Sequence, residues 1–156
     1  MTLREITRDL HHACEAHPVG ARMVRGEVTR QEWADWLNAF RVIHLVIDPR
    51  LPSHMARDRL LAADLALLPP ANASPAALRF AADLVGAPDW HGAAYVLHGA
   101  HRTGGQLMAP ALFRAGLPCA HIAYADRIAA QAWVDEARGR DDAAERARAT
   151  FGCLLA

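Results

Sequence analysis

The sequence predicts an all-α fold in one domain covering residues 1–156. Alanine and leucine dominate the composition, and no segment alternates β-branched and polar residues as a half-buried strand would. Apolar residues instead recur at helical spacing between prolines and glycines. The chain has the length of a single domain with one substantial core, and no internal repeat or low-complexity stretch marks a second one.

Local signals set the boundaries of the first helices. Pro18 ends the first helix, and Thr29 with Glu32 forms a capping box that opens the second. Asp48-Pro49 stops the second helix, and Pro69-Pro70 stops the third.

Later helices have similar signals. Ser74-Pro75 supplies an N-cap followed by proline at the first helical position. A long fifth helix contains Gly104-Gly105, and Asp142 and Glu145 have capping-box spacing before the last helix. The expected helices cover approximately residues 2–17, 29–48, 51–68, 74–86, 90–113, 120–138 and 142–155.

Charge and cysteine content limit the classes of function. The formal net charge is zero, which argues against a protein that binds nucleic acid through a basic surface. The charged N-terminus has no apolar signal core, and no apolar run has the length of a membrane span. Three cysteines without CxxC spacing fit small buried side chains in a reducing cytoplasm.

Arg4, Arg8, His11 and Glu15 share one face of the first expected helix, at spacings of 4, 3 and 4 residues. A ligand with a central metal and anionic edges would suit this stripe, and haem is such a ligand. The His11 imidazole would ligate the iron, and Glu15 would hold its other ring nitrogen. The alternative is a solvated charged face with ordinary i,i+4 pairs.

The glycine pair Gly104-Gly105 is the second informative feature. Each glycine costs about 1 kcal/mol relative to alanine inside a helix. A helix that keeps such a pair often kinks, or lets another surface approach its backbone. A flat macrocycle and a second helix are both suitable surfaces.

These two features together resemble haem oxygenases. The resemblance rests on Leu10-His11, Glu15 and the stretch GEVTR at residues 26–30, and it extends over nearly the whole chain. The segment Tyr95–Leu107 is similar to the distal helix of the bacterial branch, which is often found beside phytochromes. The implied fold is a multi-helix bundle that holds haem between the first, proximal helix and a kinked, glycine-containing distal helix.

The resemblance implies a role for each matching residue. His11 would be the proximal iron ligand, with Glu15 supporting it and Arg4 and Arg8 meeting the propionates. Tyr95 would be a pocket tyrosine. The remaining implied positions are the distal glycines Gly104 and Gly105, and a further propionate contact at Arg127.

This sequence differs from the family in three ways, two on the distal helix and one in the length of the chain. Gly99 precedes Gly104 by five residues where the family commonly has four, so either one residue is extra or Ala100 replaces the glycine. His101 stands where animal members have an aspartate that orders water around iron-bound oxygen. It would order water, donate a proton or ligate the iron. The chain is also short around residues 138–142.

The resemblance implies a haem oxygenase, which cleaves haem to biliverdin, carbon monoxide and ferrous iron. Haem would be both cofactor and substrate. A reductase of the ferredoxin or flavoprotein type would be the external electron donor, and a phytochrome would be a candidate receiver of biliverdin. The alternative is a catalytically degenerate relative that binds haem, another tetrapyrrole or no ligand, as carrier, sensor or scaffold. A di-iron protein is disfavoured because the chain has no Glu-x-x-His spacing.

The other histidines give weaker signals. His12 points about 100° away from His11 on a helix and cannot share its role. His44 lies on the apolar face of the second helix, where a hydrogen-bonded core histidine is expected. His98 and His101 have the i,i+3 spacing of a metal-binding pair, which alone is weak support for a non-haem metal site.

Overall fold

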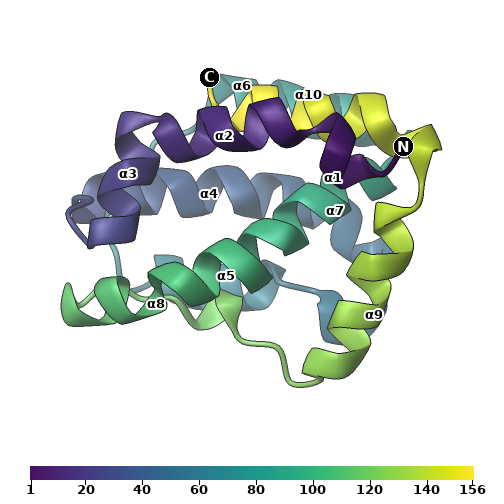
Figure 1. Ribbon diagram of the computed structural model, residues 1–156. Coiled ribbons are helices and arrows are strands. Elements are labelled where there is room, and N and C mark those ends of the chain that lie inside the picture. Colours follow the sequence, from purple (N-terminus) through teal and green to yellow (C-terminus); the bar gives the residue numbers. More distant parts are fainter.

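The computed structural model describes residues 1–156, and all its regular structure is helical, without a strand. This confirms the all-α prediction. Figure 1 shows the arrangement of the helices. The α-helices are α1 (Leu3–Ile6), α2 (Arg8–Ala16), α3 (Pro18–Arg25), α4 (Arg30–Ile47), α5 (Asp58–Leu65), α6 (Pro75–Leu84), α7 (His91–Gly99), α8 (Gly105–Arg114), α9 (Arg127–Arg138) and α10 (Ala144–Leu154). None of them is long and apolar enough to cross a membrane.

The core is built around α4, the longest helix. Thr29 caps it and forms the expected capping box with Glu32. Its apolar stripe, which includes Trp33, Leu37 and Ile43, is buried in the main core cluster. Helices α5, α6 and α7 pack against α4.

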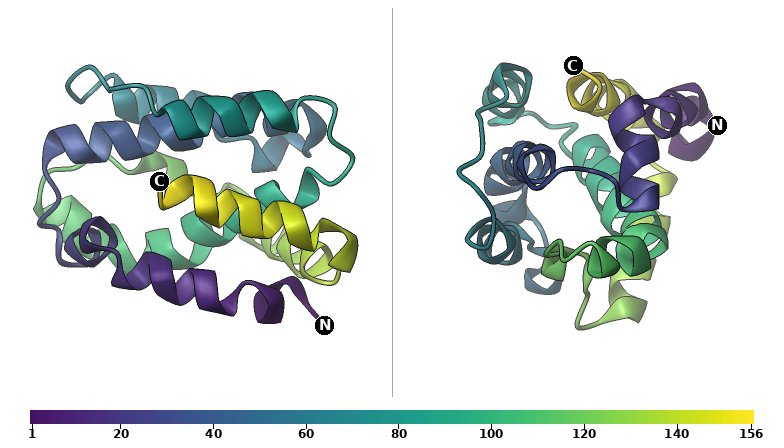
Figure 2. Two further views of the ribbon diagram at one scale, coloured as in Figure 1. Left: turned by 90° about the horizontal axis from the view of Figure 1, so that it is seen from above. Right: turned by 90° about the vertical axis from the view of Figure 1, so that its left-hand side faces the viewer.

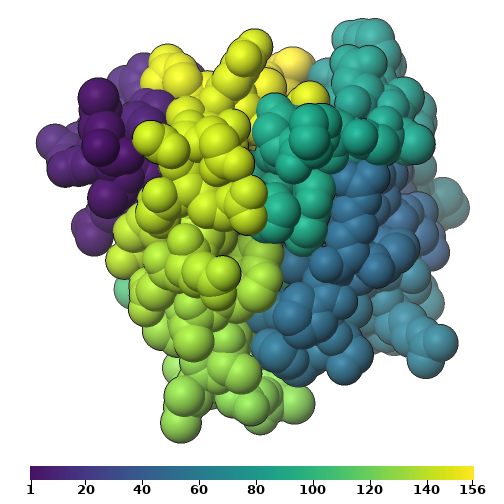
Figure 3. All heavy atoms as spheres, turned by 90° about the vertical axis from the view of Figure 1, so that its right-hand side faces the viewer, coloured from purple at the N-terminus to yellow at the C-terminus, as the bar shows by residue number.

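Helix α10 packs on α7 and is flanked by α2 and α6 (Figure 2). Its Phe151 joins Leu3 and Val96 in a second, smaller apolar cluster. The side view in Figure 3 shows the N-terminal residues at one edge of the surface, beside the C-terminal helix. Helices α1 and α2 therefore pack against α10, whereas α3 packs against α8.

The expected first helix, residues 2–17, is divided into α1 and α2, and a further helix, α3, follows it directly. Thr7 breaks it with φ −104° and ψ 5°, and the Thr7 hydroxyl donates to the Leu3 carbonyl oxygen. Pro18 does not simply end the helical region, because it occupies the first turn of α3. His17 caps α3 by accepting the Val19 N–H at Nδ1.

Two other expected helices are shorter in the structure. The third begins only at Asp58, after two short 3₁₀ turns, η1 (Asp48–Arg50) and η2 (Ser53–Met55). The Asp48 carboxylate accepts the N–H groups of Arg57 and Asp58 and so fixes the start of α5. Likewise α9 begins only at Arg127, after the 3₁₀ turn η4 (Ala120–Ile122).

The capping box expected at the last helix is absent. Ala143 is the N-cap of α10 and makes no side-chain cap. Asp142 instead pairs with Arg140 at 2.9 Å and lies in the short turn η5 (Asp141–Ala143).

The glycine pair marks a change of helix type. A π-helical turn, η3 (Ala100–Gly104), connects α7 and α8, and the Gly105 N–H donates to the Ala100 carbonyl oxygen. The two flanking helices follow one course across the front of the molecule in Figure 1. The expected irregularity is thus a widened turn, a feature that is frequent at functional sites.

Candidate functional site

The Arg4, Arg8, His11 and Glu15 stripe lies on the surface, and no residue of α2 is buried. His11 Nδ1 is 3.4 Å from Glu15 Oε1, and the two side chains are 59% and 66% exposed. Neither arginine of the stripe has an ion-pair partner in the chain. The structure therefore brings Glu15 beside the ring nitrogen that it was expected to hold, and leaves both arginines available for an anionic ligand.

Contacts with α10 restrict one side of His11. The ring centroids of His11 and Phe151 are 6.2 Å apart, in an edge-on arrangement. Helix α2 packs mainly against α10 and α3. A flat ligand bound by His11 Nε2 has to approach from the exposed side of α2, or displace Phe151.

The π-helical turn leaves open space at two glycines. In a regular α-helix, residues five apart point roughly 140° away from each other. The wider turn, closed by an i→i+5 hydrogen bond, brings Gly99 and Gly104 back towards the same side. A Cβ atom built on either glycine meets no atom within 4 Å. The five-residue separation of Gly99 and Gly104 therefore fits within a continuous helical course.

Gly105 has a different role from its neighbour Gly104. A Cβ atom at Gly105 would lie 2.6 Å from Cγ2 of Ile122, so this glycine allows η4 to pack closely against the helix. Ala100 is half-buried against the main core, and Tyr95 is half-buried between the two apolar clusters. Of the residues expected on the distal side, Gly104 therefore has the clearest open surface.

His101 does not lie on that open surface. It is 1% exposed, and its ring centroid is 5.0 Å from that of Phe40 on α4. The sequence suggested a distal side chain that orders water or ligates iron, whereas the structure directs His101 into the core. Its i,i+3 spacing places it on the same side of the helix as His98, which is also buried.

Four buried histidines form a polar cluster inside the core: His44, His98, His101 and His121. Three of them bind an oxygen atom through Nδ1. The distances are 2.8 Å from His44 to Asp48, 2.6 Å from His98 to Tyr124 and 2.6 Å from His121 to Asp64. The expectation that His44 is a hydrogen-bonded core residue is confirmed.

His44 and His101 also bind each other, with their Nε2 atoms 2.9 Å apart. Because the Asp48 carboxylate can only accept, Nδ1 of His44 carries the proton and its Nε2 accepts from His101. Burial lowers the pKa of His44 despite the neighbouring Asp48. Burial also lowers the pKa values of His98 and His101 well below their usual range. The cluster is therefore uncharged at these three rings near neutral pH.

The carboxylates beside the cluster stay ionised. Burial opposes the charge of Asp64, but hydrogen bonds from His121 and the backbone outweigh it, and the Asp64 pKa is lowered. No group of three or more His, Cys, Asp or Glu side chains is arranged to hold a metal ion. The i,i+3 histidine pair accordingly belongs to a hydrogen-bonded core in this structure. Sequence reasoning gave no role to His121, whose partner Asp64 is 57 residues away.

Arg127 lies far from the stripe on α2. It opens α9 at the bottom of Figure 1, whereas α2 crosses the top. It lines a small cavity together with Arg102 and Tyr124. The expectation that Arg127 joins Arg4 and Arg8 around one haem is therefore not supported by its position.

No family model matches the chain, and no curated protein matches it.

Proposed function

We propose that this protein binds haem through His11, in the manner of the haem oxygenases that its sequence resembles. The observation that carries the proposal is the π-helical turn, which brings Gly99 and Gly104 towards one side and leaves open space beside both. A backbone surface without Cβ atoms suits a flat ring.

The exposed stripe offers the groups that such a ligand needs. The Nε2 atom of His11 would bind the iron, while Glu15, 3.4 Å from Nδ1, would accept its hydrogen bond and orient the ring. Arg4 and Arg8 would pair with the propionates, because guanidinium groups bind carboxylates through two parallel hydrogen bonds. Bound haem would supply a redox-active iron. Enclosing the ring between α2 and η3 requires Phe151 to move from His11.

Haem oxygenation is the second candidate function, and the open space beside Gly99 and Gly104 favours it as well. Binding without turnover, as carrier or sensor, ranks first because His101 lies in the core. The chain thereby lacks, on the glycine side, the histidine that was expected to order water.

A haemin titration followed by ascorbate in air tests both forms of the proposal. We expect a Soret band that saturates at one equivalent and persists under reductant. Bleaching of the band with growth of biliverdin absorption would establish the oxygenase instead. Absence of a saturable Soret band would overturn the proposal.

A further inference from the structure

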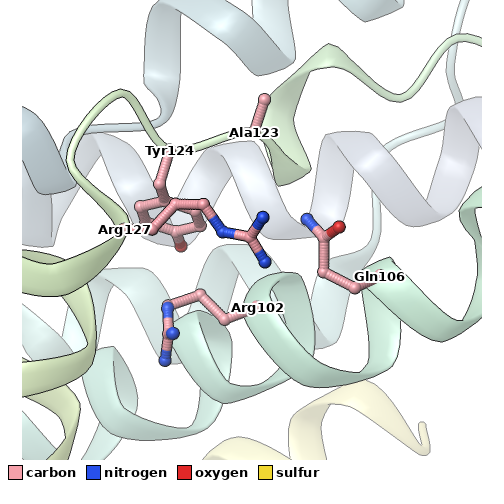
Figure 4. Close-up of a pocket in the computed structure, with 5 residues that line it drawn as sticks. All are labelled: Arg102, Gln106, Ala123, Tyr124 and Arg127. Carbon is pink, nitrogen blue, oxygen red and sulfur yellow. The ribbon is translucent and has the colours of Figure 1, made fainter.

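The cavity that contains Arg127 is a candidate site of its own. Arg102 on η3, Gln106 on α8, Ala123 and Tyr124 after η4, and Arg127 at the start of α9 line it. Figure 4 shows the Arg127 side chain crossing in front of the Tyr124 ring towards Gln106, with Arg102 below. Two stretches of the chain, residues 102–106 and 123–127, thus each contribute one arginine to the lining of one small hollow.

Neither Arg102 nor Arg127 has an ion pair or a side-chain hydrogen bond within the chain. Other arginines do form ion pairs, as Arg148 does with Asp9 and Arg41 with Asp58. No acidic residue lines the cavity. Two like charges that share a hollow without a counter-charge repel each other, and a bound anion would remove that repulsion.

A third arginine adds to the positive field behind the cavity. The guanidinium group of the buried Arg57 lies 4.0 Å from the Tyr124 ring centroid. The guanidinium group of Arg102 lies 6.0 Å from the same centroid. The Arg57 guanidinium donates to backbone carbonyl oxygens, including those of Ala56 and His54, while only the backbone N–H of Arg57 donates to a carboxylate, that of Asp48. Its charge is therefore only partly offset, and clefts lined by one sign of charge concentrate the opposite ion.

The size of the cavity limits the ligand. Its volume is about 170 Å³. Ligand pockets usually have ~300–1,000 Å³, so this cavity is small. A tetrahedral oxyanion fits, whereas a macrocycle does not. The amide of Gln106 is already fixed, because its Nε2 donates to the Ile122 carbonyl oxygen at 2.9 Å.

We propose that Arg102 and Arg127 bind the phosphate group of a small phosphate monoester, with the rest of the molecule outside the cavity. A dianion matches the two guanidinium charges, and guanidinium forks match the geometry of phosphate oxygens. This site is separate from His11 and does not depend on haem binding.

Calorimetric titration of the haem-free protein with inorganic phosphate at pH 7.5, in a chloride buffer of fixed ionic strength, tests the proposal. We expect saturation at one equivalent, and at least tenfold weaker binding of acetate. Arg102→Gln and Arg127→Gln should each weaken phosphate binding at least tenfold. Arg114→Gln is the matched control, since Arg114 is exposed on α8, unpaired and outside the cavity.

All three variants should keep the circular dichroism spectrum and melting temperature of the parent, because their side chains make no hydrogen bonds in the chain. His11→Ala should bind phosphate normally, which separates this site from the haem proposal. Equal weakening by Arg114→Gln, or heat that never saturates, would show only adventitious ion binding and overturn the proposal.

Discussion

The Nε2 atoms of His44 and His101 lie 2.9 Å apart where neither side chain reaches water. This contact joins the longest helix, α4, to the π-helical turn. One ring must donate and the other must accept, so the hydrogen bond exists only while the pair shares a single proton at that point. The irregular turn is thereby tied to the core by a bond that depends on protonation.

The free protein should lose stability in mild acid. The pKa values of His98 and His101 are lowered well below the usual 6.5 by burial, so below pH 6.5 the unfolded chain takes up protons that the folded chain does not. Stability is complete above pH 6.5 and falls as the pH drops towards the folded-state pKa values. Two such groups lower the free energy of unfolding by up to about 2.7 kcal/mol for each pH unit.

Urea unfolding at several pH values between 7.5 and 5 measures this effect. His12→Ala is the control, because His12 is exposed and its removal should leave the slope unchanged. A flat profile between pH 6.5 and 5.5 would contradict the neutral state of the buried rings.

Tyr124→Phe should destabilise the protein by about 1–3 kcal/mol. The substitution removes the only hydrogen-bond partner of His98, whose Nε2 is already buried without one. Tyr95→Phe is the comparison, since the hydroxyl of this half-buried tyrosine makes no hydrogen bond, and it should stay within about 0.5 kcal/mol of the parent. Chemical denaturation of both variants gives the difference, and equal effects would show that the Tyr124 hydroxyl is dispensable.

The adjacent glycines should respond oppositely to alanine. Gly104→Ala adds a Cβ atom in open space within a helical segment and should raise the free energy of unfolding by up to about 1 kcal/mol. Gly105→Ala places its Cβ atom 2.6 Å from Ile122 and should lower it by about 1–3 kcal/mol. Thermal melts distinguish the two. If Gly104→Ala destabilises as much as Gly105→Ala, the open surface beside the turn does not exist.

His11→Ala should abolish or shift the Soret band of the haem complex, because His11 is the proposed iron ligand. His12→Ala should leave the band nearly unchanged, since its ring points about 100° away on the helix. Haemin titrations of the two variants under one condition make the comparison. The reverse pattern would mean that the neighbouring histidine is the ligand.

Features set by neighbours in the sequence were predicted well. The capping box of Thr29 and Glu32 and the Ser74-Pro75 start are both present. The capping-box spacing of Asp142 and Glu145 gave a wrong prediction, because the Asp142 carboxylate binds Arg140 outside the helix. The break at Thr7 depends on a hydroxyl that bonds back to Leu3, and helical periodicity does not show such a bond.

The candidate site was predictable only in part, for a related reason. Spacing alone placed His11 beside Glu15 on one face. The direction of His101 depended on which side of a largely buried helix meets α4, and α7 has buried residues nearly all around it. Two of the pairs in the polar cluster join residues 57 apart, His44 with His101 and Asp64 with His121. No local pattern encodes these distances.

Helix α2 contributes no fully buried side chain, so an exposed ion pair adds to the partial burial of its Leu10 and Cys14 against the smaller apolar cluster. The Arg148 guanidinium holds both oxygens of Asp9 at 2.9 Å, on the exposed surface. Salt weakens such an exposed ion pair, while it barely affects contacts in the packed interior. Amide protons of α2 should therefore exchange with deuterium before those of α4, and faster as ionic strength rises. We expect α1 and α2 to open while the rest stays folded, which would let a large planar ligand enter between His11 and Phe151 without global unfolding.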